Sequence, residues 1–183
     1  RTENVYIVEG YTDVIAMESQ GFKAVAPLGT SLTIEHFKLV WRFVNEPTLF
    51  MDGDSAGMNA SIRALDLVMP ELRGENSLNL IFLKEDKDPD DIINGSEKTY
   101  SLSSLLNNKQ SLIESLFMLY GNEEVLNSPE RIVSFKNKIL TKIKNINDPD
   151  IRNLYRSFTV NRINEISKTQ INKFGSITNN KRK

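Results

Sequence analysis

Short apolar runs alternate with segments of helical periodicity over the first half of the chain. The runs are rich in β-branched and aromatic residues, which is typical of buried strands. Between the runs, apolar residues recur at intervals of three and four, as on one face of a helix. The predicted strands are 5–8, 24–26, 48–51 and 77–83, and the predicted helices are 12–21, 33–43 and 55–69. This alternation predicts an α/β fold in which helices flank a mostly parallel sheet.

The second half of the chain has a different pattern. After Gly95 the strand pattern stops and only helical periodicity remains. Ser128-Pro129 and Asp148-Pro149 each place a capping side chain directly before a proline, which is a typical helix start. We therefore expect a sheet domain over 1–95, a C-terminal all-helical subdomain over 96–174, and a flexible polar tail over 175–183.

Composition narrows the possible chemistry of the 183-residue chain. It contains no cysteine and one histidine, which excludes a disulfide framework and a structural zinc site built from this chain alone. A bound metal ion would need oxygen ligands, which favours magnesium, manganese or calcium. No apolar run reaches the roughly 18 residues of a membrane span, so we expect a cytoplasmic protein without membrane contact.

Charge is distributed unevenly along the chain. Residues 1–95 contain 8 basic and 16 acidic residues, whereas residues 96–183 contain 15 basic and 8 acidic residues. From Arg131 onward there are 13 basic and only 3 acidic residues. This segment either lies against a polyanion such as a nucleic acid or is an ordinary solvated helix surface, and the sequence favours neither.

Acidic residues follow three of the predicted strands. Glu9 comes directly after the first strand, Asp52 and Asp54 follow the strand 48–51, and Asp88 and Asp90 lie shortly after the last strand. In a parallel sheet, ligands bind beyond the carboxyl ends of the strands. A single Asp in a loop is usually a cap or a turn former, but several converging carboxylates repel one another unless a cation compensates them. Together these acids predict a divalent-metal site.

These acids and the residues around them resemble a Toprim domain, a Rossmann-like magnesium-binding module. The stretches "VEGYTDVIA", "APLGTSLT", "FMDGDSAGMNASIRAL" and "FLKEDKDPDDII" occur in the order that is characteristic of bacterial DnaG-type DNA primases. The resemblance implies Mg²⁺ or Mn²⁺ bound by Glu9, Asp52, Asp54, Asp88 and Asp90. It also implies that Glu9 is either a metal ligand, which we prefer for a primase, or a catalytic proton-transfer group. Asp13 would orient the "EGYTD" turn or reach a metal ion through water.

The resemblance further implies part of the catalytic core of a primase, a DNA-directed RNA polymerase and nucleotidyltransferase. Its expected partners are a single-stranded DNA template, ribonucleoside triphosphates and the RNA primer, with the core acting as a monomer. Relatives carry an N-terminal zinc domain and a domain that binds the replicative helicase in the primosome. We expect neither domain within this chain, so zinc is expected only in the missing N-terminal domain of the full-length protein, and the isolated fragment is expected to be inactive.

Three other interpretations remain open at this level. A Toprim-type nuclease would use similar acids to hydrolyse phosphodiesters, although "EGYTDVIA" followed by "APLGTS" favours a primase. A phosphatase with Asp52 as nucleophile is disfavoured because "SAG" follows Asp54 where that family has threonine or valine. A nucleic-acid-binding fragment without activity of its own would use the basic helices alone.

Overall fold

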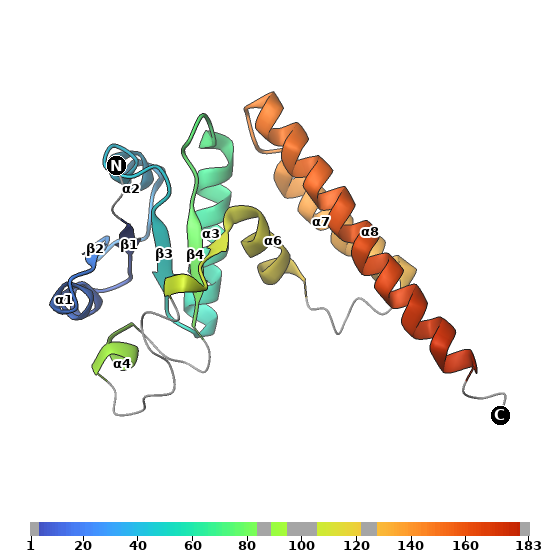
Figure 1. Cartoon of the computed structure of the whole chain (residues 1–183). Helices are drawn as coiled ribbons and strands as arrows, with labels where there is room; N and C mark the ends of the chain where they lie inside the picture. Colours follow the sequence, from blue (N-terminus) through green and yellow to red (C-terminus); the bar gives the residue numbers. More distant parts are fainter. Residues whose placement is uncertain (1–3, 84–88, 95–105, 122–127, 180–183) are drawn as a thin grey trace. The chain divides into compact units, whose positions relative to one another are not determined.

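The computed structural model describes residues 4–83, 89–94, 106–121 and 128–179 (Figure 1). In this part of the chain five strands form one sheet in the order β2-β1-β3-β4-β5. The pairs β1–β2, β1–β3 and β3–β4 are parallel, and β4–β5 is antiparallel. The strands are β1 (Val5–Ile7), β2 (Lys23–Val25), β3 (Thr48–Met51), β4 (Asn79–Phe82) and β5 (Gln110–Ser111).

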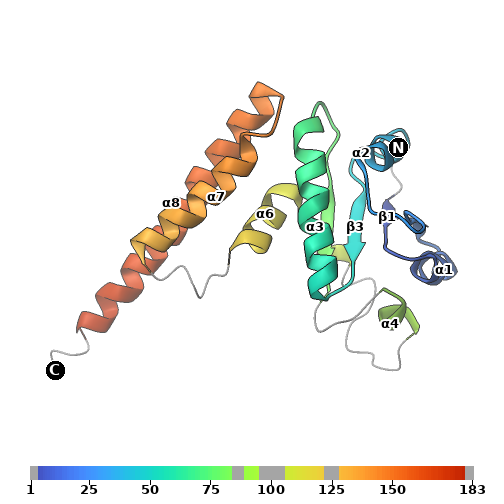
Figure 2. The ribbon, with the colours of Figure 1, turned by 180° about the vertical axis from the view of Figure 1, so that it is seen from behind.

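Helices connect and cover the strands of the sheet. The helix α3 lies along β3 in both views of the ribbon (Figure 1 and Figure 2). On the other face, α1 packs against α4 and β2. The helices that accompany the sheet are α1 (Tyr11–Ser19), α2 (Ile34–Val40), α3 (Ser55–Val68) with a short 3₁₀ turn (Met69–Glu71), and α4 (Pro89–Asn94).

Each face of the sheet buries its own apolar layer because alternate strand residues point to opposite sides. Tyr6 and Phe50 belong to one cluster, which also includes Met17 of α1. The neighbouring strand residues Ile7 and Leu49 are also fully buried. The sheet therefore has no solvated face at its centre, as expected for parallel strands covered by helices.

The observed elements confirm the predicted fold class. A mostly parallel sheet with flanking helices is followed by helices, and strand 48–51 has the predicted bounds. Sequence reasoning missed β5, which has only two polar residues and therefore no detectable periodicity. These two residues form a strand because they pair with β4, so the sheet continues beyond residue 95.

The chain divides into two compact units, Arg1–Ser115 and Leu116–Lys183. The second unit contains the end of α6 (Leu112–Tyr120) with α7 (Pro129–Ile143) and α8 (Pro149–Asn179). Thus α8 includes the first residues of the segment expected to be a tail. Among the described residues, no helix is both long and apolar enough to cross a membrane.

Both predicted helix starts in this second unit have the expected caps. The Ser128 hydroxyl accepts a hydrogen bond from the backbone N–H of Arg131 at 3.3 Å. The Asp148 carboxylate accepts from the N–H groups of Asp150 and Ile151 at 2.9 and 3.0 Å. These bonds satisfy donors that the first turn of a helix leaves unpaired.

The turn between β3 and α3 is packed too tightly for a side chain at one position. A Cβ atom on Gly57 would overlap the carbonyl oxygen of Asp52 and lie 3.0 Å from its carbonyl carbon. Both neighbouring atoms belong to the backbone, so neither can move aside cheaply. Glycine here allows α3 to begin directly behind the end of β3.

Replacing Gly57 by alanine should destabilise the sheet unit by about 1–3 kcal/mol, the usual cost of overpacking. The direction of this change in stability is informative, because helix propensity alone would favour alanine by roughly 1 kcal/mol. Urea unfolding followed by the fluorescence of Trp41, the single tryptophan, measures this change. Ala56→Ser, at an exposed position of the same helix, is the control and should have little effect. Equal stability of Gly57→Ala and the wild type would contradict the close contact.

Candidate metal centre

Glu9 and Asp52 follow two strands that are neighbours in the sheet. β1 pairs in parallel with β3, with Ile7 opposite Leu49, so the carboxyl ends of both strands lie at one edge. From β1 the chain continues to β2 on one side, and from β3 it continues to β4 on the other side. This reversal of strand order is the place where open α/β sheets bind ligands.

The Glu9 side chain is half-buried at this edge. Burial raises the pKa of Glu9 above its ordinary value, while a hydrogen bond from the backbone of Asp52 lowers it. The carboxylates of Asp54 and Asp13 raise the pKa further, and the Arg63 guanidinium lowers it. The Oε1 atom of Glu9 is buried and accepts no hydrogen bond from the described residues. The described residues therefore compensate the negative charge of Glu9 only in part.

Asp54 has a structural role as well as a position near Glu9. It is the N-cap of α3, and its Oδ1 accepts a hydrogen bond from the backbone N–H of Gly57 at 2.7 Å. This bond fixes the side chain with one oxygen toward the helix. The carboxylate keeps further lone pairs that a ligand can use.

Gly53 separates the two aspartates and brings the turn close to the neighbouring strand. A Cβ atom on Gly53 would lie 3.0 Å from the carbonyl carbon of Leu83, directly after β4. The turn after β3 therefore touches the chain at the point from which it continues toward Asp88. Residue 88 itself lies outside the described residues.

Asp13 is buried and acts on the turn that follows β1. Its Oδ2 accepts a hydrogen bond from the backbone N–H of Gly10 at 3.0 Å, and Gly10 is the N-cap of α1. This is the turn-orienting role, one of the two that the sequence suggested for Asp13. Through this bond Asp13 holds the backbone that carries Glu9.

The complete predicted ligand set is only partly within the described structure. The backbone of Asp90 lies in α4, but its side chain, like all of Asp88, is outside the described part. Among the described residues, no group of three or more His, Asp or Glu side chains is placed to hold one metal ion. The structure thus brings Glu9 close to the two aspartates of the β3 turn without a complete ligand cage.

The chemistry of the described acids fits a divalent cation. Glu9 offers a buried oxygen that accepts no hydrogen bond within the described part of the chain, and it lies near the carboxylates of Asp54 and Asp13. A cation at this edge would relieve both the desolvation of Glu9 and the repulsion between the carboxylates. Oxygen ligands of this kind suit Mg²⁺ or Mn²⁺.

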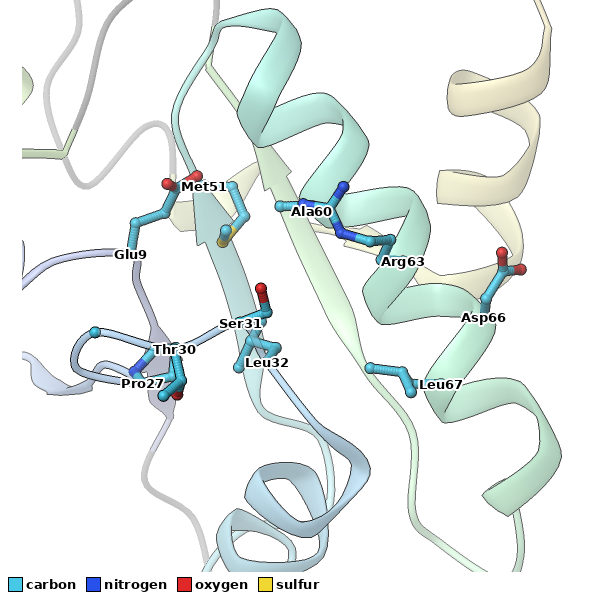
Figure 3. A pocket seen from close by; sticks show the side chains of 11 residues that line it. Glu9, Pro27, Thr30, Ser31, Leu32, Met51, Ala60, Arg63, Asp66 and Leu67 are labelled. Carbon is cyan, nitrogen blue, oxygen red and sulfur yellow. The ribbon is translucent and has the colours of Figure 1, made fainter.

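A cavity of about 750 Å³ adjoins Glu9 on the side of α3. It lies between the loop 27–32 and α3, and Arg63 extends from the helix toward that space (Figure 3). Sequence reasoning did not select Arg63 as a functional residue. Ala60, Arg63 and Leu67 all line the cavity, and their helical spacing on one face of α3 is the signal that could have identified it.

Comparison with known proteins agrees with these features. Residues 3–80 match the family model described as Toprim domain. The chain is 33% identical over 153 residues to the DNA primase of Rickettsia typhi, covering 83% of this chain and 26% of that protein. It is 38% identical over 127 residues to the DNA primase of Neisseria meningitidis serogroup A, covering 69% of this chain and 22% of that protein.

Solved structures give the same assignment. A DNA primase domain from Pseudomonas aeruginosa aligns with a TM-score of 0.75 at 31% identity, over 90% of this chain and 50% of that one. A DnaG primase catalytic domain bound to ssDNA aligns with a TM-score of 0.73 at 29% identity, over 88% and 52%. The chain spans about a quarter of the length of the curated primases that it matches. It contains a Toprim domain and corresponds to a fragment of the catalytic core of DnaG-type primases.

Proposed function

We propose that this chain supplies the metal-binding part of a primase that synthesises short RNA primers on single-stranded DNA. The observation that supports this most directly is the poorly compensated Glu9 carboxylate beside the aspartates of the β3 turn. In the reaction, a 3′-hydroxyl attacks an α-phosphate and pyrophosphate leaves. Negative charge develops on phosphate oxygens, which positioned cations stabilise.

The proposed ligands are Glu9, Asp52 and Asp54, with Asp88 and Asp90 completing the set. Bound Mg²⁺ would neutralise phosphate charge and orient the reacting groups. Asp13 fixes the turn that positions Glu9 through its bond to Gly10. Because Glu9 and Asp52 project from adjacent strand ends, their separation is set by the sheet, which preserves the geometry between turnovers.

We also propose that the helical unit contributes to holding the nucleic acid. Its exposed basic side chains outnumber its exposed acidic ones along α7 and α8, which favours contact with phosphates. The related catalytic domain that was solved with ssDNA makes a single-stranded template a reasonable partner for this chain as well. The exposed basic residues are Arg131, Lys138, Lys144, Arg156, Arg162 and Lys168.

Glu9→Gln should raise the melting temperature of the metal-free chain at about pH 8. The pKa of Glu9 is raised in the folded state. The contribution of Glu9 to the free energy of unfolding is therefore complete below the unfolded-state pKa and is lost as the pH rises through the folded-state pKa. The advantage of glutamine should therefore shrink toward about pH 4. Thermal unfolding at several pH values, with and without MgCl₂, measures this difference.

The same experiment tests the metal site. MgCl₂ should raise the melting temperature of the wild type and should have little effect on Glu9→Gln. Glu46→Gln, an exposed acid outside the site, should behave like the wild type. Equal stabilisation of wild type and Glu9→Gln by magnesium would remove Glu9 from the ligand set.

Asp52→Asn, introduced into a complete primase that contains this region, should reduce primer synthesis at least about 100-fold, as removal of electrostatic stabilisation commonly does. The amide keeps the size of the side chain and removes its charge, so the fold should persist by circular dichroism. Incorporation of labelled ribonucleotides on a single-stranded template measures the rate, with Glu46→Gln as the control. Near-normal priming by Asp52→Asn would refute the proposal, and degradation of the template by the wild type would favour a Toprim-type nuclease.

Single-stranded DNA binding by the chain should weaken steeply with salt. In Lys138→Gln/Lys144→Gln, the slope of log affinity against log salt should fall by about 0.7 for each phosphate that the protein no longer neutralises. Fluorescence anisotropy of a labelled oligonucleotide at several KCl concentrations gives this slope. Asp150→Asn, at an exposed acid of α8, is the control. An unchanged slope in the double variant would show that these lysines do not face the DNA.

A further inference from the structure

The cavity beside Glu9 has a charge distribution that differs from that of the carboxylate edge. Glu9 and Met51 line the end of the cavity at the strand termini, and Arg63 lines it from α3. Across from α3, the loop 27–32 contributes the hydroxyl side chains of Thr30 and Ser31 (Figure 3). Hydrogen-bond donors therefore border the space next to the acids.

Arg63 is the one basic side chain among the described residues that line this cavity. Helical side chains tilt toward the N-terminus of their helix, so Arg63 leans toward the end of α3 that follows Asp54. Ala60 lies one turn before it on the same face and is small enough to leave room for the guanidinium. Arg63 is also close enough to Glu9 for the two charges to interact.

An anionic ligand held by the carboxylate edge through a cation would still be repelled by those carboxylates. A guanidinium a short distance away offsets this repulsion, and its planar array of N–H donors matches phosphate oxygens. The hydroxyl groups of Thr30 and Ser31 can donate to the same oxygens. Asp66 of α3 also lines the cavity, but its carboxylate points away from the loop 27–32 (Figure 3). Apart from the charged and hydroxyl side chains, the lining residues are apolar, so phosphate binding is confined to the side with Arg63, Thr30 and Ser31.

We propose that Arg63, with Thr30 and Ser31, forms a subsite for the polyphosphate tail of a nucleoside triphosphate beside Glu9. The proposal rests on the proposed function for the identity of the nucleotide, but the subsite itself requires no metal ion. Its position would hold the phosphates that leave as pyrophosphate on the α3 side of the carboxylate edge.

The test measures binding of inorganic tripolyphosphate to the 183-residue chain in EDTA, by chemical-shift changes of backbone amides. Arg63→Gln should weaken binding about tenfold, the effect of removing one charge-assisted hydrogen bond. The affinity of Arg63→Lys should lie between those of the wild type and Arg63→Gln, since lysine keeps the positive charge but lacks the planar array of N–H donors. Arg73→Gln, an exposed arginine outside the cavity, should bind like the wild type.

Several outcomes would overturn the subsite. These are equal binding by Arg63→Gln and the wild type, equal weakening in Arg63→Gln and Arg73→Gln, or no saturable binding by the wild type. Adenosine binding in the cavity without tripolyphosphate binding would make it a nucleoside site instead. Asp52→Asn should retain tripolyphosphate binding in EDTA, because Asp52 does not line the cavity. The two proposals can therefore fail separately. Absence of tripolyphosphate binding would not affect the proposal of metal-dependent primer synthesis, and near-normal primer synthesis by Asp52→Asn would not affect the subsite.

Discussion

The parallel pairing of β1 with β3 determines where the side chains of the candidate site lie. Since Ile7 lies opposite Leu49, the residues that follow both strands emerge at one edge of the sheet. A shift of this register by one residue would turn Glu9 to the other face. The buried apolar residues on both faces of these strands oppose such a shift, so core packing fixes the position of the acids.

Backbone packing tightens this arrangement where the acids begin. Gly57 brings the first turn of α3 against the backbone of Asp52, and Gly53 brings the same turn against Leu83. The cap formed by Asp54 then fixes the start of the helix. Negative charge is thereby held at a half-buried edge, where the described residues compensate Glu9 only in part. A divalent cation is the simplest complement to this charge, and the cavity next to it suits the anionic part of a nucleotide.

Much of this was predictable from the sequence because the relevant signals are local. The strand 48–51 is an apolar run that ends at Asp52, and the caps at Ser128 and Asp148 are recognisable from the residues beside them. Glu9, Asp52 and Asp54 were selected because they follow strands, which is a local property as well.

What could not be predicted depends on contacts between distant segments. β5 is a strand only because it pairs with β4, and its two residues have no periodicity of their own. Likewise, Arg63 resembles any charged helix residue until the fold places it across from the loop 27–32.

The most direct measurement of the central claim is the anomalous scattering of a manganese-soaked crystal of this chain. We predict a peak at the carboxyl edge of β1 and β3, within coordination distance of the Glu9 and Asp52 carboxylates. A strong manganese peak elsewhere, with none at this edge, would contradict it.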